Sequence, residues 1–421
     1  MINMAKVKFI HAADIHLDSP LRGLSKYEGV PADQVRLATR TALDNLVAFA
    51  IDEAVDFVVI AGDLYDGNWE DFGTGLFFCG CMGRLHRAGI DVYLLYGNHD
   101  AESVLTRRLP LPENVHVFGH KRPETFTHEA TGVALHGQSY RERDTTTNLA
   151  AAYPASVSGS FNIGVLHTAL AGRPPHAPYA PCTPAELVAR GYDYWALGHV
   201  HDFEIVATGP HIVFPGNLQG RNIRETGAKG AVLVTLEGRE IQAVDHVPLD
   251  AVRWARVSVD VSDHEHDEAI FHSIKKGIGE AYDADADGRP QMLRVVLSGV
   301  TPLHGKLSDR FATLRDEVRA LATAVSDTIW VEKVKLETTE PASEHFDVSL
   351  GADLGQLLEQ GIGDQELIDA LKLDYTDLVT RLPAELGDES DVLKALRNAD
   401  LTGVLEQAAT SLKSRLTGAG A

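Results

Sequence analysis

The feature that most constrains this chain is a set of short apolar runs that each end in aspartate, asparagine or histidine. The runs have the length and the β-branched or aromatic content of buried strands. Open α/β sheets bind ligands at the carboxyl ends of their strands, so polar residues at those ends predict one shared site. The runs that carry such residues are 7–10, 57–61, 92–96, 163–166 and 194–197.

The segments between the runs predict how the strands are connected. Amphipathic patterns at 33–54 and 70–88 separate the first three strands and give a β-α-β-α-β order, which favours parallel strands. After Val115 the strands follow one another more closely, with turn residues between them, so we expect antiparallel hairpins there. Two sheets flanked by helices are the predicted outcome. The additional strands are expected at 115–118, 133–136, 212–214 and 231–236.

The pattern changes at Arg253, where a second α/β unit is predicted. A strand at 254–261 precedes a helix at 263–281, for which Ser262 is the candidate N-cap. The rest of this unit is expected as a strand at 292–297, a helix at 306–322 and a strand at 329–336.

An acidic segment closes the chain. From Glu337 to Ala421 there are 17 acidic and 6 basic residues, a net charge of −11 out of −22 for the whole protein. Its apolar residues recur at helical spacing, so we expect a helical tail. The predicted domains are 1–250, 251–337 and 338–421.

The polar residues at the strand ends have the chemistry of metal ligands. Asp14 and His16 lie two residues apart, and in an extended segment such side chains point the same way. Asp63 has two oxygens with which it can bridge two cations. Asn98 offers an amide oxygen, and the neighbouring His99 can protonate a leaving group. We expect one dinuclear metal site formed by Asp14, His16, Asp63, Asn98, His167, His199 and His201.

The composition of this ligand set indicates the metal and the reaction. Two carboxylates, one amide and four imidazoles suit Mn²⁺, Fe or Zn²⁺ better than Ca²⁺ or Mg²⁺, and Mn²⁺ is the ion we expect. Two such ions generate a nucleophile from water near neutral pH and stabilise phosphoryl oxygens as charge develops. The predicted reaction is hydrolysis of a phosphoester, with His99 as general acid and Asp66 as the group that orients it.

These motifs resemble those of a known family. The order Asp-x-His, Gly-Asp-x-x-Asp, Gly-Asn-His-Asp, a single His and Gly-His-x-His resembles the calcineurin-like metallophosphoesterases. More narrowly, the chain is similar to the bacterial DNA repair exonucleases of the SbcD type, and most similar to their YhaO branch. The resemblance covers roughly the first 250 residues, and the remainder only in layout. The segments that carry it are 11–20, 61–67, 192–201 and 214–221.

The resemblance implies a fold, a ligand assignment and partners. The fold would be a four-layer αββα sandwich, followed by a small α/β cap domain and a helical tail that docks an SMC-like ATPase. DNA would be the substrate, and a homodimer is expected. One ion would be held by Asp14, His16, Asp63 and His201, and the other by Asp63, Asn98, His167 and His199. The chain departs from SbcD-type nucleases at Asp66, where they often carry histidine and phosphatases of the superfamily carry aspartate.

Six arginines in loops near the motifs are candidates for contact with the substrate, and solvation is the alternative role of each. Arg221 is the strongest candidate because its glycine-rich loop closely follows the His199–His201 segment. The other candidates are Arg22, Arg141, Arg143, Arg173 and Arg224.

Several other polar features have a structural interpretation. His136 ends a strand and could approach the site. His11 precedes Asp14 by an odd number of residues, so its side chain would point to the other face of the strand, and packing is its expected role. Residues 283–288 imitate the start of an EF-hand loop, but the twelfth position is Arg294, so we expect a solvated turn. The three cysteines are too few for a disulfide framework or a second metal site.

The chain has no run of ~20 apolar residues, and its start lacks the layout of a signal peptide. We therefore expect a cytoplasmic protein that does not enter the membrane. The net charge of −22 is unusual for a DNA-binding protein, but half of it lies in the tail.

Three functions remain open from the sequence. The leading hypothesis is a metal-dependent exonuclease that acts in DNA repair with an SMC-like ATPase. The alternative is a phosphatase or nucleotide phosphodiesterase, which Asp66 and the acidic charge favour. A scaffold protein with a decayed site is the third hypothesis, and the complete set of ligands argues against it.

Overall fold

The computed structural model describes residues 6–19, 37–66, 72–102, 110–171, 179–262 and 264–341, with a few single residues between 364 and 409. Arg22, Arg173 and nearly all of the predicted acidic tail lie outside these ranges. The chain divides into two compact units, one formed by residues 1–255 with 285–292, the other by 256–284 with 293–421.

The first unit opens with the predicted β-α-β-α-β order. Strands β1, β2 and β3 are parallel and neighbours in one sheet, and helices α2 and α3 connect them. Strand β4 extends the sheet in parallel, while β11 and β12 continue it on the other side as antiparallel strands. The bounds are β1 Lys6–Ala12, α2 Ala38–Asp52, β2 Phe57–Ala61, α3 Phe72–Arg87, β3 Asp91–Leu95, β4 Val115–Val117, β11 Gly230–Glu237 and β12 Glu240–Pro248.

The second sheet has the order β5-β6-β7-β8-β10-β9. Only its edge pairs, β5 with β6 and β10 with β9, are antiparallel as we expected for this region, and the edge strands β5 and β9 themselves were not predicted. Strands β6, β7, β8 and β10, at the centre of this sheet, are parallel, so the prediction of antiparallel pairing was wrong for them. The connections after β6 and β7 are long enough to return the chain to the same end of the sheet, as parallel pairing requires. The bounds are β5 Glu124–Thr127, β6 Ala134–Gly137, β7 Asn162–His167, β8 Tyr194–Gly198, β9 Phe203–Thr208 and β10 His211–Pro215.

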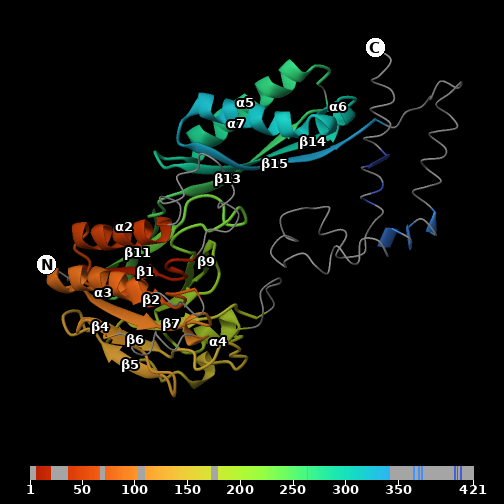
Figure 1. Cartoon of the computed structure of the whole chain (residues 1–421). Coiled ribbons are helices and arrows are strands. Elements are labelled where there is room, and N and C mark those ends of the chain that lie inside the picture. Colours follow the sequence, from red (N-terminus) through yellow and green to blue (C-terminus); the bar gives the residue numbers. More distant parts are fainter. Residues whose placement is uncertain are drawn as a thin grey trace, which may run out of the picture. The chain divides into compact units, whose positions relative to one another are not determined.

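The two sheets pack face to face, with helices on the outside (Figure 1). One core cluster joins α2 and α3 to the first sheet, and a second lies between the sheets. A third covers the outer face of the second sheet, together with α4, Pro184–Val188, and the short 3-10 turn Ala150–Ala152. The order of layers is the predicted αββα, with a thin fourth layer.

The second unit contains the three-stranded sheet β13-β14-β15 and its helices. The order of strands and helices follows the prediction, with two corrections. Helix α5 begins at Asp267, and the hydroxyl of Ser262 donates to Asp260, so Ser262 is not its N-cap. The helix expected at 306–322 is broken at Arg310. The bounds are β13 Arg253–Asp260, α5 Asp267–Asp285, β14 Gln291–Val300, α6 His304–Asp309, α7 Phe311–Val325 and β15 Ile329–Thr339.

Of the helices in the described ranges, none is both long enough and apolar enough to cross a bilayer.

Candidate metal centre

The loops at the carboxyl ends of five parallel strands carry the predicted ligands. Asp14 follows β1, Asp63 follows β2 and Asn98 follows β3, all in the first sheet. His167 is the last residue of β7, and His199 comes directly after β8, both in the second sheet. The site therefore lies where the same ends of both sheets meet, and the layered fold brings its residues together.

The backbone of these loops is not extended as we expected. Asp14 has a φ of 50° and His16 a φ of 45°, so the two side chains do not share a face by strand alternation. Asp63 at 50° and His199 at 101° are also in the left-handed region, which costs energy for residues with a Cβ. Hydrogen bonds hold the strained segment: the amide of Asp14 donates to the carbonyl of Gly62 at 3.0 Å, and that of His16 to Asp63 at 3.0 Å.

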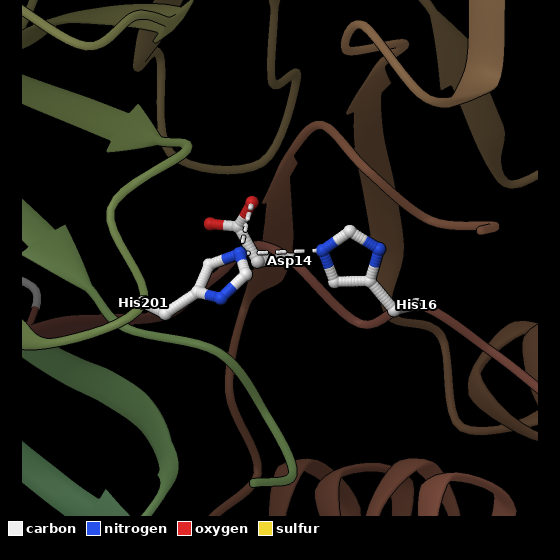
Figure 2. Close-up of side chains that lie close together, drawn as sticks. All are labelled: Asp14, His16 and His201. Carbon is white, nitrogen blue, oxygen red and sulfur yellow. Dashed lines mark hydrogen bonds and ion pairs between the residues drawn. The ribbon is translucent and has the colours of Figure 1, made fainter. Parts of the chain in front are cut away.

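The first group of ligands consists of Asp14, His16 and His201, shown in Figure 2. Nε2 of His16 lies 3.3 Å from Nε2 of His201, which in turn lies 3.8 Å from Oδ1 of Asp14. Oδ2 of Asp14 accepts the backbone N–H of His199 at 2.8 Å. Oδ1 of Asp14 is buried and has no hydrogen-bond partner. A buried carboxylate oxygen without a donor fits a cation, because leaving it unpaired is costly.

The second group consists of Asp63, His167 and His199, and Asn98 adjoins it. Nε2 of His167 lies 3.4 Å from Oδ2 of Asp63 and 2.9 Å from Oδ1 of Asn98. Nδ1 of His167 donates to the carbonyl of Ala61 at 3.0 Å. Because that nitrogen carries a proton, Nε2 is the atom that would bind a cation beside Asp63 and Asn98, and without a cation it carries a hydrogen toward these two oxygens.

Asp63 connects the two groups. Its Oδ2 lies 3.4 Å from His167 and 4.0 Å from His16, and its Oδ1 accepts the N–H of His99 at 3.0 Å. The donors fit a pair of cations: Asp14, His16, Asp63 and His201 would hold one, and Asp63, Asn98, His167 and His199 the other. This is the predicted assignment.

His99 and Asp66 lie beside the ligands. Nδ1 of His99 is 3.2 Å from Oδ1 of Asp66, and the hydroxyl of Ser19 donates to Oδ2 of Asp66 at 2.7 Å. Burial would lower the pKa of His99, but the hydrogen bond to Asp66 and the charges of Asp63 and Asp66 raise it above its ordinary value. The imidazole therefore lies against Asp66 through Nδ1, which leaves Nε2 for another contact, and the role of Asp66 in orienting an acid stays a prediction.

The charges of the site shift its titration. Burial would raise the pKa of Asp63, yet the neighbouring imidazoles, His167 foremost, hold it well below its ordinary value. Burial would lower the pKa of His167, but the charge of Asp63 raises it to about 9. Each group stabilises the charged form of the other, which is the behaviour of a site that holds a cation when one is bound and a proton when none is.

Two carboxylates that support the site were not predicted. Asp100 is buried and accepts the backbone N–H groups of Leu64, Tyr65 and Gly97 at 3.1, 2.8 and 3.0 Å. It thereby joins the loops after β2 and β3. Burial and the charge of Asp63 raise the pKa of Asp100 to about 7. Its place in the Gly-Asn-His-Asp motif was the available signal.

Glu225 is the other unpredicted carboxylate. It is 7% exposed, and its Oε1 lies 2.9 Å from Nδ1 of His201. A single glutamate in a loop has no periodic signal, so only the tertiary structure reveals this contact.

Arg221 lies at the edge of the site. Its Nη2 is 3.3 Å from Oε1 of Glu225, and its Nη1 is 3.8 Å from Oδ1 of Asp66. Among the other arginine candidates within the described ranges, Arg141, Arg143 and Arg224 are exposed.

Two histidines singled out in the sequence lie in the core. His136 is buried between Thr125 and Asn162, with its ring stacked on Tyr192, so it does not join the ligands. His11 is buried between the two sheets, with Nδ1 3.0 Å from the hydroxyl of Tyr194 and Nε2 3.0 Å from the carbonyl of Leu197. Packing is therefore its role, as expected.

Two glycines allow the loops to approach this closely. A Cβ at Gly198 would lie 2.0 Å from the carbonyl oxygen of Ala61, and one at Gly97 would lie 2.3 Å from Oδ1 of Asp63. No side chain fits at either position, and at Gly198 the backbone of β8 lies directly against that of β2.

Comparison with known proteins agrees with this geometry. Residues 7–203 match the family model of the calcineurin-like phosphoesterases, and residues 254–339 match that of the middle domain of the metallophosphoesterase YhaO. The chain is 36% identical over 303 residues to the uncharacterized metallophosphoesterase YhaO of Bacillus subtilis, covering 71% of this chain and 73% of that protein.

More distant relatives also match. The DNA double-strand break repair protein Mre11 of Methanopyrus kandleri is 24% identical over 64% of this chain and 63% of its own length. The Thermoplasma acidophilum protein of that name is 22% identical over 86% of this chain and 92% of its length. A crystal structure of a dimetal phosphatase from Danio rerio has a TM-score of 0.35 and 15% identity, covering 57% of this chain and 96% of that one. On the family match and the similarity to YhaO, this chain belongs to the calcineurin-like phosphoesterases, and within them it is similar to the YhaO branch.

Proposed function

We propose that the chain is a dinuclear metal-dependent phosphodiesterase that acts on DNA, as an exonuclease in DNA repair. The observation that carries the proposal is the pair of adjacent ligand groups, with Asp63 of the second group 4.0 Å from His16 of the first and the His99–Asp66 pair beside them. Asp63 is 1% exposed, and its Oδ2 lies 3.4 Å from His167 and 4.0 Å from His16, so one buried carboxylate faces both groups. Two adjacent cations can stabilise both the attacking and the leaving oxygen of a phosphoryl transfer.

The residues divide the chemistry among them. The bound ions, Mn²⁺ with Fe or Zn²⁺ as alternatives, would supply an activated nucleophile and stabilise the phosphoryl oxygens. His99 would donate a proton to the leaving oxygen from Nε2, because Nδ1 faces Asp66. Ser19 keeps Asp66 in place, and Arg221 would bind a phosphate oxygen of the substrate.

The relatives named as DNA double-strand break repair proteins support DNA as the substrate. Their similarity covers 64% and 86% of this chain. The net charge of −22 opposes DNA binding, and 17 of the acidic residues lie at or after Glu337. The tail would therefore lie away from the DNA and dock an SMC-like ATPase.

A second candidate function is hydrolysis of a small phosphoester or of a nucleotide phosphodiester. The observation that favours it is Asp66, which takes the position where SbcD-type nucleases often carry histidine. As an anion 3.7 Å from His16 and 3.2 Å from His99, it adds negative charge where a DNA backbone would approach.

One experiment separates these functions. The purified full-length chain is incubated with Mn²⁺ and, in parallel, with single-stranded DNA, double-stranded DNA, a cyclic dinucleotide and a simple aryl phosphodiester. Degradation of DNA ends with the highest kcat/KM supports the proposal. Turnover of only the small substrates, also after addition of the ATPase, contradicts it. An Asp63→Ala variant is the control for contaminating nucleases, because the loss of the bridging carboxylate should abolish turnover of every substrate.

The partner and the dimer need separate measurements. Light scattering of the chain alone should give the mass of a dimer. A variant ending at residue 341 should keep hydrolysis of a small phosphodiester and lose binding to the SMC-like ATPase. Undiminished binding of the ATPase by this variant would contradict a role of the tail in docking.

A further inference from the structure

Glu225 lies behind the metal ligand His201, outside the predicted site. Oε1 is 2.9 Å from Nδ1 of His201 and 3.3 Å from Nη2 of Arg221. Oε2 accepts the backbone N–H of Arg221 at 2.7 Å and the side-chain amide of Asn217 at 2.9 Å. Each oxygen therefore faces two donors, and the carboxylate is 7% exposed.

The contact between Glu225 and His201 determines the tautomer of the imidazole. A carboxylate only accepts hydrogen bonds, so the 2.9 Å contact with Oε1 places a proton on Nδ1 of His201, and Nη2 of Arg221, at a longer 3.4 Å from Nδ1, donates to Oε1 instead. In the neutral ring Nε2 is then free of hydrogen, and it is this atom that lies 3.8 Å from Oδ1 of Asp14 and 3.3 Å from Nε2 of His16. The lone pair on Nε2 of His201 is thus directed to the other two residues of the first group, Asp14 and His16.

The backbone of the same residue is held independently. Nζ of Lys229, which is 4% exposed, donates to the carbonyl of His201 at 2.8 Å. Lys229 therefore holds the backbone of His201 in place when the contact with Glu225 is lost. A change at Glu225 should then affect only the orientation and the tautomer of the His201 imidazole.

We propose that Glu225 is a positioning residue that keeps Nε2 of His201 available to one of the two metal ions and holds Arg221 beside Asp66. This inference rests on the proposed dinuclear site, but not on DNA as the substrate. It assigns a function to a residue that carries no ligand atom. Partners of this kind typically account for 10–100-fold in metal affinity.

The carboxamide of a glutamine side chain cannot replace this carboxylate. The backbone N–H of Arg221 cannot be rotated, so in Glu225→Gln the amide oxygen would stay opposite that N–H and the NH₂ would face Nδ1 of His201. The imidazole would then accept at Nδ1 and carry its proton on Nε2, where the ion should bind. The substitution is therefore expected to weaken the binding of the ion that His201 contacts. The binding of the other ion should not change, because its ligand His167 is oriented by the carbonyl of Ala61.

The test measures metal binding of the full-length chain with Mn²⁺ as the probe. Calorimetry and metal analysis should give two ions per wild-type chain, and electron paramagnetic resonance should show a coupled Mn²⁺ pair. We expect Glu225→Gln to retain one ion with an uncoupled spectrum and to bind the second about 10–100-fold more weakly. The matched control is Glu240→Gln on the exposed start of β12, which should bind both ions as the wild type does.

A purely structural role of Glu225 would lower the affinity of both ions or of neither, so either result overturns the inference. A second measurement is independent of whether the variant folds. In the metal-free wild type at alkaline pH, ¹⁵N NMR, assigned with His201→Gln, should find the proton on Nδ1 of His201. A proton on Nε2 would overturn the inference. A wild-type chain that binds fewer than two Mn²⁺ ions would instead contradict the proposed function.

Discussion

At the scale of single residues, the contact between His99 and Asp66 leads to a prediction about proton transfer. We expect His99→Gln to lower kcat by about 10²–10⁴-fold, because the leaving oxygen loses its acid. The number of bound ions should not change if His99 acts as the acid, whereas the loss of an ion would identify His99 as a ligand, because it also clusters with His16 and Asp63. Steady-state kinetics together with metal analysis tests both statements. Wild-type kcat in the variant would exclude His99 as the acid.

A second prediction at this scale concerns His11, which is buried far from solvent between the two sheets. Burial lowers the pKa of His11 to about 3, from 6.5 in the unfolded chain, although its hydrogen bond to Leu197 opposes the shift. Between these values the unfolded state binds a proton that the folded state does not, so the free energy of unfolding falls as the pH falls below 6.5. The slope is about 1.4 kcal/mol per pH unit.

The His11→Gln variant isolates this contribution, because a glutamine side chain can donate to the carbonyl of Leu197 but does not titrate. Urea unfolding of both proteins between pH 7 and pH 4 should give a steeper loss of stability for the wild type. Parallel curves would show that His11 does not cause the acid sensitivity.

At the scale of elements, replacing two glycines of helix α5 with alanine should change the free energy of unfolding in different ways. A Cβ at Gly279 meets nothing within 4 Å, whereas one at Gly277 lies 3.1 Å from Cγ1 of the buried Val257 on β13. Gly279→Ala should therefore raise the free energy of unfolding by about 0.5–1 kcal/mol. Gly277→Ala should gain less than this or lose stability, because the helix would have to move away from the strand. Denaturant unfolding of the two variants checks the order, and a larger gain at Gly277 would show that α5 does not pack this closely.

The elements also show how far sequence patterns reach. The strands that carry ligands were predicted within two residues of their ends, because continuous apolar runs leave few alternatives. The exposed edge strands β5, β9 and β12 were missed, since their half-polar sequences have no strong period. Helix α4 was missed although Thr183 and Glu186 form a capping box at its start.

At the scale of the whole molecule, metal binding should stabilise the first unit. The strained loops of both sheets share the ions, and an ion that binds only the folded state stabilises it by mass action. A free Mn²⁺ concentration ~100 times the dissociation constant adds about 2.7 kcal/mol. We expect the midpoint of thermal unfolding to rise by about 5–10 °C over the chelated protein. Asp63→Ala should show no such shift, and equal midpoints with Mn²⁺ and with chelator in the wild type would contradict the site.

The sequence by itself determined the α/β class, the parallel strands β1, β2 and β3 and the identity of the candidate ligands, because these depend on local periodicity and on residue chemistry. Only the tertiary structure decided the directions of β6, β7, β8 and β10, since strand direction depends on where a long connection returns. It also decided the contacts of Glu225 and Asp100, which join loops far apart in the chain. The seven candidate ligands lie together because two sheets meet at one end, and their strained backbone, with Asp14 at a φ of 50°, is held by contacts that no local pattern encodes.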